Sequence, residues 1–222
     1  MDGRPNPGRS AADAQLRLRL GAVLVAVAVL AAGVLAAFEG DLLAGEQALF
    51  EAGNDLPRPI GVILQAVMSA GTSLAAVAVV AVAIVTGRRR LAAEAGLAWL
   101  GARLLSTLLK AAVDRPRPPD LLDGVTLRQD LPGDAGFPSS HTAIAVALAL
   151  AAGHTWPRLQ VPLLVLAALV AVARLYVGVH LPLDLVGGAA LGVVCGVGAL
   201  AGVEAWTRRA GRPPHDRPDN SP

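Results

Sequence analysis

The hydrophobic and polar positions of the chain fall into long alternating blocks, and most apolar blocks approach the length of a membrane-spanning helix. Such a helix needs about 20 predominantly apolar residues. Six apolar segments are separated by polar stretches, and they cover approximately residues 20–38, 60–86, 91–113, 142–155, 159–177 and 183–206. The second is long enough to begin at the membrane interface, and the fourth is short. The pattern predicts an all-α, polytopic membrane protein with six transmembrane helices.

The composition supports this fold class. Of the 222 residues, 54% are hydrophobic but only 3% are aromatic, which is typical of a helical membrane protein. Apolar segments continue almost to the last residue, so the first is interpreted as a retained helix rather than a cleaved signal peptide. The single cysteine, Cys195, rules out an intrachain disulfide and any site built from several cysteines. We expect this thiol to pack inside the sixth helix.

The charges predict an orientation in the membrane. A formal net charge of +2 is too small to indicate a nucleic-acid partner. The arginines lie beside alternate membrane boundaries: Arg4, Arg9, Arg17, Arg19, Arg88, Arg89, Arg90, Arg158, Arg208, Arg209, Arg212 and Arg217. Because cytoplasmic loops carry an excess of Lys and Arg, these regions are predicted to be cytoplasmic. Both termini of a multi-pass cell-membrane protein then face the cytoplasm, whereas the loop after the third helix and the turn after the fifth face outside.

The two ends of the chain are Pro- and Gly-rich and polar, which is typical of disorder. We therefore expect a disordered cytoplasmic tail at residues 1–18, one six-helix membrane domain at residues 19–207 and a second disordered cytoplasmic tail at residues 208–222.

Two cations lie near the outer ends of apolar segments, Lys110 in the third and Arg174 in the fifth. An ionisable group at membrane depth is costly unless it lines a wet cavity or meets a partner, so each is a functional candidate. The alternative is that each side chain extends to the membrane interface.

The chain continues from Lys110 as KAAVDRPRPPD, and Arg117 follows seven residues later. The prolines stop the helix and fix the backbone direction. Lysine supplies a compact charge and arginine a bidentate fork for oxygen anions, so Lys110 and Arg117 are predicted to form an oxyanion cradle. Arg115 lies beside Asp114. We favour a structural ion pair between these two, with a place in the cradle as the alternative for Arg115.

The stretch FPSSHT, residues 137–142, begins the fourth apolar segment. Ser139 is a good N-cap, and Ser140 and His141 then occupy the first helical turn. A helix N-terminus exposes unpaired amides and the positive end of its dipole, which favours a bound phosphate. A plain capping serine beside an interfacial histidine is the alternative interpretation.

The stretch ARLYVGVHLPLDLVGG places Arg174 at the end of the fifth helix, His180 in the outer turn and Asp184 in the first turn of the sixth helix. A carboxylate four residues after a histidine can accept the hydrogen of one ring nitrogen and leave the other nitrogen free to attack an electrophile. A satisfied interfacial His and Asp pair is the alternative. Glycines then recur every fourth residue, at Gly188, Gly192 and Gly196, which favours close packing of a neighbouring helix, and we expect this neighbour to be the fourth.

In this order and spacing, Lys110 with six residues before Arg117, then PSSH, then Arg174 with five residues before His180 and three more before Asp184 resemble the type-2 phosphatidic acid phosphatase family. That family belongs to a superfamily shared with vanadate-dependent haloperoxidases and bacterial non-specific acid phosphatases. The resemblance covers about residues 55–205, including the six-span layout.

The resemblance implies phosphoryl transfer through a phosphohistidine. His180 would be the nucleophile, Asp184 would orient it, and His141 would act as general acid toward the leaving oxygen and then as base toward water. The other motif residues would bind the phosphate oxygens: Lys110, Arg117, Arg174, Ser139 and Ser140, with the backbone amides of Ser140 and His141. The serines of FPSSHT are then phosphate ligands rather than nucleophiles.

Two positions depart from the family pattern. Ser140 stands where the family usually has glycine, and Ala173 stands where it usually has serine. We expect the serine to tune the phosphate site and the alanine to remove one hydroxyl contact. Two further charges in the third segment are less clear. Glu94 has no assigned role, and Arg103, two turns before Lys110, is expected to face the same polar cavity.

Neither a metal nor a cofactor is expected, because three fixed cations can stabilise the charge of a phosphoryl group and no acidic, His or Cys cluster has metal-ligand spacing. A weak calcium or magnesium site in the outer loop is the alternative, built from Asp120, Asp123, Asp130 and Asp134.

The leading hypothesis is a metal-independent lipid phosphate or lipid diphosphate phosphatase whose substrate enters from the outer leaflet of the bilayer. Candidate substrates are undecaprenyl diphosphate, phosphatidylglycerophosphate and phosphatidic acid. A phosphotransferase to a lipid or sugar hydroxyl would use the same residues. A non-catalytic phosphate-lipid binder or transporter would need the cations but not the two histidines. Whether copies of the chain form a homo-oligomer stays open.

Overall fold

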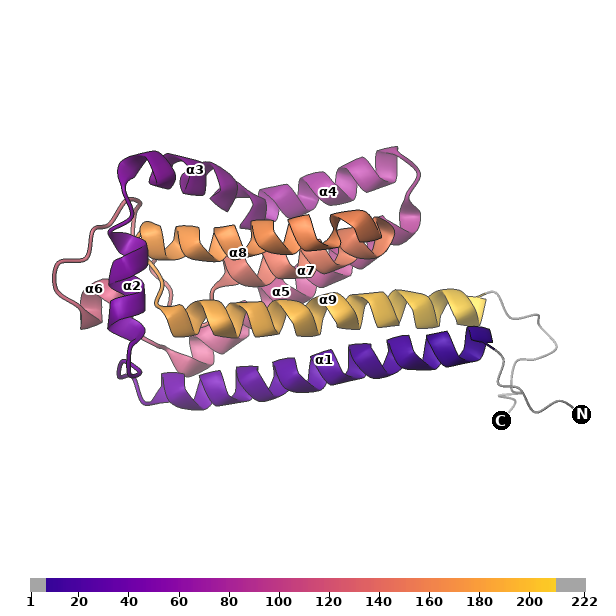
Figure 1. Ribbon diagram of the computed structural model, residues 1–222, viewed down its shortest axis with the longest axis horizontal. Helices are drawn as coiled ribbons and strands as arrows, with labels where there is room; N and C mark the ends of the chain where they lie inside the picture. Colours follow the sequence, from indigo (N-terminus) through magenta and orange to yellow (C-terminus); the bar gives the residue numbers. More distant parts are fainter. Residues whose placement is uncertain (1–6, 211–222) are drawn as a thin grey trace, which may run out of the picture.

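The computed structural model describes residues 7–210 of the protein (Figure 1). All regular elements in this range are helical, which confirms the all-α prediction. In chain order they are α1 (Pro7–Phe38), α2 (Glu46–Asn54), α3 (Arg58–Met68), the 3₁₀ turn η1 (Ser69–Gly71), α4 (Ser73–Val85), α5 (Arg89–Val113), α6 (Pro118–Leu121), α7 (Ser140–Thr155), the 3₁₀ turn η2 (Pro157–Leu159), α8 (Gln160–Tyr176) and α9 (Pro182–Ala210).

Four helical stretches in the described range are long and apolar enough to cross a membrane: Asp13–Phe38, Arg89–Leu121, Pro157–Tyr176 and Pro182–Ala210. A fifth span arises if the pair Arg58–Gly71 and Ser73–Val85, which is bent by 58°, is counted as one. The predicted fourth span corresponds to α7, which has only 16 residues. The chain is therefore a membrane protein whose second predicted segment is broken and whose fourth is a short internal helix.

The break between α3 and α4 has a local cause. Thr72 has an extended backbone, and its side chain caps α4 by accepting a hydrogen bond from the amide of Ala75. A Cβ on the preceding Gly71 would lie 2.6 Å from the backbone oxygen of His141. The bend therefore brings the start of α4 against the start of α7.

Helix α7 is the centre of the bundle, and it packs against α5, α8 and α9. Residues 142–149 of α7 are all buried, as expected for a helix without a polar face. Much of the core around α7 consists of alanine, which allows the neighbouring helices to approach closely. The start of α7 is consequently held in place from several sides.

The glycine stripe of α9 faces α7, as predicted. A Cβ at Gly188 would lie 2.5 Å from the carbonyl oxygen of Ser139, and one at Gly192 would lie 2.6 Å from the carbonyl oxygen of Ala143. Because only glycine fits at such separations, the stripe fixes the register between α9 and α7. The amide of Ser139 also donates to the carbonyl oxygen of Asp184 at 2.9 Å, which ties together the starts of these two helices.

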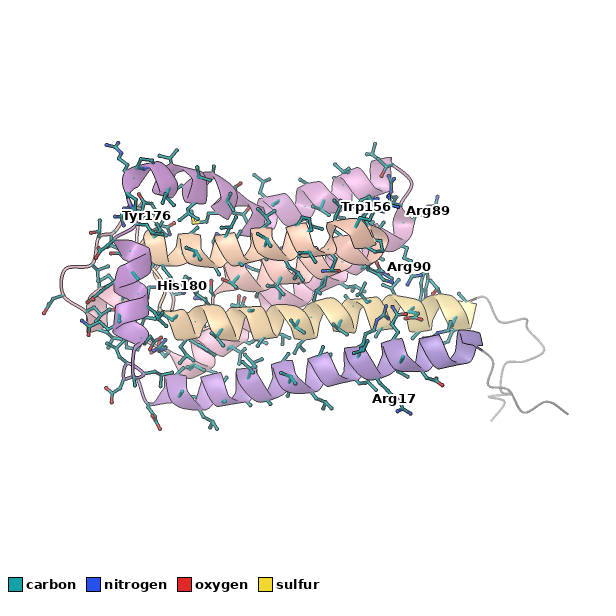
Figure 2. All side chains as sticks on the ribbon, in the orientation of Figure 1. Arg17, Arg89, Arg90, Trp156, Tyr176 and His180 are labelled. Carbon is teal, nitrogen blue, oxygen red and sulfur yellow. The ribbon has the colours of Figure 1, made fainter. Side chains whose placement is uncertain are left out.

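The charged ends of the bundle are well separated. Arg17, Arg89, Arg90 and Trp156 lie at one end, and His180 lies at the other (Figure 2). At the arginine-rich end, buried Glu94 accepts a hydrogen bond from Arg90 at 2.8 Å and contacts a ring nitrogen of His154 at 3.3 Å. Glu94 therefore joins α5 to α7, a structural role that the sequence did not reveal.

Part of each predicted tail is helical. Helix α1 already begins at Pro7 and α9 continues to Ala210, because the helical backbone extends beyond the apolar segments. The rest of the predicted tails, residues 1–6 and 211–222, lies outside the described residues.

At the other end, the polar stretch after α1 contains the helix α2, which the sequence did not predict. Asn54 at its last turn donates to the carbonyl oxygens of Thr126, Leu175 and Tyr176 and accepts from the amide of Thr126. These bonds fasten α2 to the loop after α6 and to the end of α8.

Candidate active site

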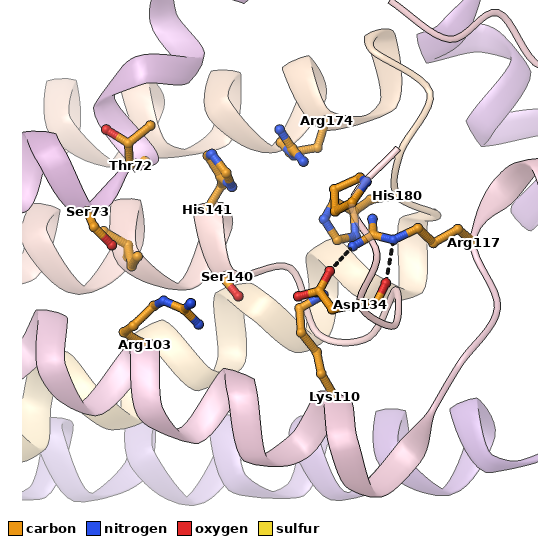
Figure 3. A pocket seen from close by; sticks show the side chains of 13 residues that line it. Thr72, Ser73, Arg103, Lys110, Arg117, Asp134, Ser140, His141, Arg174 and His180 are labelled. Atoms are coloured by element: carbon orange, nitrogen blue, oxygen red, sulfur yellow. Dashed lines mark hydrogen bonds and ion pairs between the residues drawn. The ribbon is translucent and has the colours of Figure 1, made fainter. Parts of the chain in front are cut away.

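A cavity of about 320 Å³ opens near the His180 end of the bundle. It is lined by residues from the α3–α4 break, α5, the α5–α6 turn, the loop between α6 and α7, α7, α8 and the α8–α9 turn: Gly71, Thr72, Ser73, Arg103, Lys110, Arg117, Pro132, Asp134, Ser140, His141, Ile144, Arg174 and His180 (Figure 3). Six of the eight predicted site residues line this cavity. The other two, Ser139 and Asp184, are fully buried beside it.

His180 and Asp184 form the predicted pair. Nδ1 of His180 lies 3.2 Å from Oδ2 of Asp184, and this oxygen also accepts the amide of Leu181 at 2.9 Å. With Nδ1 as the donor, Nε2 keeps its lone pair. Burial lowers the pKa of His180 to about 3, because desolvation and the neighbouring cations Arg174 and Lys110 outweigh the attraction of Asp184. The imidazole is therefore neutral, as a nucleophile requires.

The second oxygen of Asp184 is held by an arginine. Arg115 Nη1 donates to Asp184 Oδ1 at 2.9 Å, and Arg115 also makes a bidentate contact with Glu46 at 2.8 and 3.2 Å. Glu46 Oε1 further accepts the amide of Leu183 at 2.8 Å. All three charged side chains are buried. The predicted ion pair of Arg115 with Asp114 is therefore wrong in its partner, because Asp114 ends α5 in the left-handed conformation and the next residue turns inward.

Lys110 and Arg117 converge on one acidic side chain, as Figure 3 shows. Arg117 Nη2 lies 2.6 Å from Asp134 Oδ1, and Lys110 Nζ lies 3.6 Å from Asp134 Oδ2. Partial burial alone would raise the pKa of Asp134, but Lys110 and Arg117 lower it below its ordinary value. Asp134 is thus an ionised carboxylate and the shared anionic partner of Lys110 and Arg117. Its side chain is about half exposed.

Backbone contacts orient the same two cations. Lys110 Nζ donates to the carbonyl oxygens of Ala135 and, at 3.4 Å, Gly136. Arg117 Nε donates to the carbonyl oxygen of Asp134 at 2.8 Å, and Nη1 donates to that of Val179 at 2.6 Å, one residue before His180. Arg117 therefore connects the loop before α7 to the turn that carries the histidine.

Arg174 is the third predicted cation, and it is buried at the end of α8. Nη1 contacts the sulfur of Met68 at 3.1 Å and Oε1 of Gln129 at 3.2 Å. Its Nε is buried and has no hydrogen-bond partner within residues 7–210. No carboxylate in this range lies within ion-pair distance of Arg174. Arg174 therefore has donor capacity left for an anion in the cavity.

The PSSH stretch begins α7 as predicted, and its two serines differ in position. The side chain of Ser139 caps the helix by accepting from the amide and hydroxyl of Thr142 at 3.5 and 3.1 Å, and it does not line the cavity. Ser140 lines the cavity, and its hydroxyl donates to Ser106 Oγ on α5 at 2.9 Å. His141 points into the cavity from the first turn of α7 (Figure 3).

Several residues of this site were not found from the sequence. Glu46 and Gln129 meet their partners from distant parts of the chain, and Ser106 meets Ser140 across two helices. Asp134 was considered only as a metal ligand, yet within residues 7–210 no group of three or more His, Cys, Asp or Glu side chains is placed to hold a metal ion. Arg103 lines the cavity, as the helical spacing from Lys110 predicted.

Comparison with known proteins gives the family. The sequence profile described as the PAP2 superfamily matches residues 91–208, which is more than half of the 222-residue chain. Two curated relatives from strains of Mycobacterium tuberculosis, each named decaprenylphosphoryl-5-phosphoribose phosphatase, are 35% identical over 109 residues. The match spans 49% of this chain and 59% of the relatives' length.

Two solved structures share the fold. LpxE of Aquifex aeolicus has a TM-score of 0.66 and 28% sequence identity, with 72% of this chain and 96% of that chain covered. A transmembrane PAP2-type phosphatidylglycerolphosphate phosphatase from Bacillus subtilis has a TM-score of 0.60 and 22% identity, with 87% of this chain and 98% of that chain covered. At this identity the similarity concerns the fold alone. The profile match includes the residues that carry the family resemblance in the sequence, from Lys110 to Asp184. The chain therefore belongs to the PAP2 superfamily.

Proposed function

We propose that the protein is a lipid phosphate phosphatase that acts through a phosphohistidine on His180. The observation that carries this proposal is the buried chain of contacts from Arg115 through Asp184 to Nδ1 of His180, beside a cavity with three candidate phosphate ligands. A site that only binds phosphate needs cations. It has no use for a neutral histidine oriented by a buried carboxylate and for a second histidine facing the same cavity.

The proposed reaction has two steps, formation and hydrolysis of a phosphohistidine. Nε2 of His180 attacks phosphorus while the bond to the leaving oxygen breaks, and His141 donates its proton to that oxygen. Water then attacks the phosphohistidine, His141 takes a proton from the water, and the bond between phosphorus and nitrogen breaks. Inorganic phosphate leaves, and His180 is again neutral.

Charge stabilisation comes from the side chains around the cavity. Phosphoryl transfer places negative charge on the non-bridging oxygens, and catalysis consists mainly of positioning and electrostatic stabilisation. Lys110, Arg117 and Arg174 supply three cations, and Arg174 has an unused buried donor. Entry of the phosphate requires that it replace the carboxylate of Asp134 beside Lys110 and Arg117. Ser140 and the amides that begin α7 then complete the anion site.

The proposed substrate is a phosphorylated lipid, because the cavity belongs to a membrane protein and its lining includes residues on the apolar helices α5 and α8. The candidate substrates include diacyl lipid phosphates. They also include polyprenyl-linked phosphates, because the Mycobacterium tuberculosis relatives are named for such a substrate.

The test is phosphate release by the detergent-purified chain in excess chelator, with phosphatidic acid, a phosphorylated phosphatidylglycerol and a polyprenyl diphosphate as substrates. We expect wild-type protein to release phosphate and His180→Ala to be inactive. Release by His180→Ala at the wild-type rate would refute the assigned nucleophile. Product analysis in the presence of glycerol or a sugar detects transfer to a hydroxyl, which would make the protein a phosphotransferase.

We also propose that the cavity faces outside the cell, because the arginine-rich end of the bundle lies opposite His180 (Figure 2). Cys195 is the only cysteine and is buried, so single introduced cysteines can be labelled against a silent background. A membrane-impermeant maleimide should label Asp123→Cys in intact cells but not Arg158→Cys, and both positions are exposed. The reverse pattern would invert the orientation.

A further inference from the structure

A fourth cation in the cavity has no place in the reaction described above. Arg103 lies on α5, seven residues before Lys110, and its side chain lines the same cavity. Figure 3 shows its guanidinium pointing toward Ser140, on the far side of Ser140 and His141 from His180. Since His141 is the acid for the leaving oxygen, Arg103 lies on the leaving-group side of the site.

The position of Arg103 is unusual for a charged residue, because its side chain is exposed at membrane depth and lines the cavity. It lies in the middle of a candidate membrane span, where a charge is costly unless it faces a partner or a wet cavity. Its side chain donates a hydrogen bond from Nη1 to the hydroxyl of Thr107. No carboxylate within residues 7–210 lies at ion-pair distance from it. A guanidinium presents five donors, so most of them remain for a ligand.

Other polar groups lie near Arg103. Thr72 and Ser73, at the break between α3 and α4, line the cavity on the same side as Arg103 (Figure 3). The Ser73 hydroxyl accepts from Nε1 of Trp99 at 3.2 Å, so its own proton is available for a second acceptor. A guanidinium with neighbouring hydroxyl donors suits phosphate oxygens.

Resting on the proposed function, we propose that Arg103 binds a second phosphate, carried by the leaving group of the substrate. Seven residues of α-helix separate Arg103 from Lys110, which corresponds to about 10 Å along the axis. This separation favours a second phosphate joined to the first through a polar spacer over a direct diphosphate linkage. The preferred substrate is then a phosphomonoester on a sugar or glycerol unit whose other end is joined to the lipid by a phosphodiester.

The experiment compares lipids that differ in the second phosphate. The substrates are phosphatidic acid, a phosphatidylglycerol phosphorylated on its terminal hydroxyl with the same acyl chains, and a polyprenyl diphosphate. The variants are Arg103→Gln, Arg103→Lys and the matched control Arg89→Gln, which makes the same change on an exposed arginine at the other end of α5.

We expect Arg103→Gln to lower kcat/KM for the phosphorylated phosphatidylglycerol at least about tenfold more than for phosphatidic acid, as expected for loss of a charged hydrogen bond. The effect should lie mainly in KM, because the second phosphate is bound equally before and during the reaction. Arg103→Lys should retain part of the preference for the phosphorylated phosphatidylglycerol over phosphatidic acid. Arg89→Gln should retain this preference in full.

Three results would overturn the proposal. Arg103→Gln could lower kcat/KM equally for all substrates, or it could lower kcat/KM for none of them. It could also lower kcat/KM only for the polyprenyl diphosphate, which would contradict a spacer between the two phosphates. A wild-type protein that hydrolyses none of the lipids would refute the proposed function instead. Activity of wild type on phosphatidic acid, lost in His180→Ala, keeps the two failures apart.

Discussion

Arg115 Nη1 lies 2.9 Å from Oδ1 of Asp184, whose other oxygen contacts the ring of His180. The arginine therefore contacts His180, the proposed nucleophile, only through the carboxylate and does not itself line the cavity. Glu46 holds the other side of the guanidinium, so the position of Asp184 depends on α2, an element from the beginning of the chain. The site is thus supported by four buried charged or titratable side chains in a row: Glu46, Arg115, Asp184 and His180.

Breaking this row should affect stability and rate together. Removing one partner of a buried ion pair costs about 3–5 kcal/mol. We expect Glu46→Gln, which keeps the shape but removes the charge, to lower both the melting temperature in detergent and kcat. Asp114→Asn is the matched control, because asparagine tolerates the left-handed conformation of this residue and Asp114 is not the partner of Arg115. If the two variants behave alike, Glu46 does not support the site.

Asp134 should compete with the substrate phosphate. Its carboxylate pairs with Lys110 and Arg117, and these cations keep its pKa below the ordinary value, so it stays charged at neutral pH. We expect Asp134→Asn to bind inorganic phosphate or vanadate more tightly, by about threefold to tenfold, as measured by product inhibition. Asp130→Asn, an exposed change in the same loop, should leave inhibition unchanged. Weaker inhibition of Asp134→Asn would show that Asp134 helps to bind the phosphate.

The pH profile should not report protonation of His180 near neutrality. A free histidine titrates near 6.5, but burial lowers the pKa of His180 to about 3, so its neutral form persists as the pH falls from 7 to 4. The acid limb of kcat/KM should therefore follow the second ionisation of the substrate phosphate, near pH 6. Burial and the cations Arg174 and Lys110 lower the pKa of His141 to about 4 in the free protein. A bound phosphate dianion opposes these cations and raises that pKa, so kcat should fall at higher pH as His141 in the complex loses the proton that it donates.

Substrates with different phosphate pKa values separate these causes. An electron-withdrawing ester group lowers the second pKa of the phosphate, and the acid limb should move with it by the same amount. An acid limb fixed near pH 6.5 for every ester would show that a histidine of the enzyme titrates there instead.

The contact between α9 and α7 should tolerate no side chain. A Cβ at Gly188 would lie 2.5 Å from the carbonyl oxygen of Ser139, so Gly188→Ala must displace the start of α7. Overpacking of this kind typically costs about 1–3 kcal/mol, and we expect a lower melting temperature and a lower kcat. Gly198→Ala is the control on the same helix, because nothing lies within 4 Å of its added carbon. Equal melting temperatures for both variants would contradict the close packing.

Much of the fold and the site could be predicted from local sequence. The helices follow from the apolar blocks. The family resemblance implied that Lys110, Arg117, His141 and His180 share one phosphate site, and in the structure these four residues line one cavity. The glycines of α9 predicted the contact with α7, because small residues every fourth position mark one helix face.

The remaining features depend on contacts between distant segments. Glu46 and Arg115 are separated by 69 residues, and no pattern along the chain relates them. The neighbouring Asp114 was the obvious partner for Arg115, but the backbone turn after α5 directs the guanidinium inward. The position of Asp134 depends on how the loop before α7 folds over Lys110, and the chain ahead of FPSSHT carries no signal for that fold.

The most direct test of the account is to trap the phosphorylated enzyme. Protein with His141→Ala, which lacks the base for the second step, is mixed with a lipid or aryl phosphate that carries a good leaving group, quenched in alkali and analysed by peptide mass spectrometry. The account predicts a phosphoryl group on His180 that is labile in acid, and none in a variant that also carries His180→Ala. A phosphoryl group on Ser139 or Ser140 would contradict it, because a serine and not His180 would then be the nucleophile.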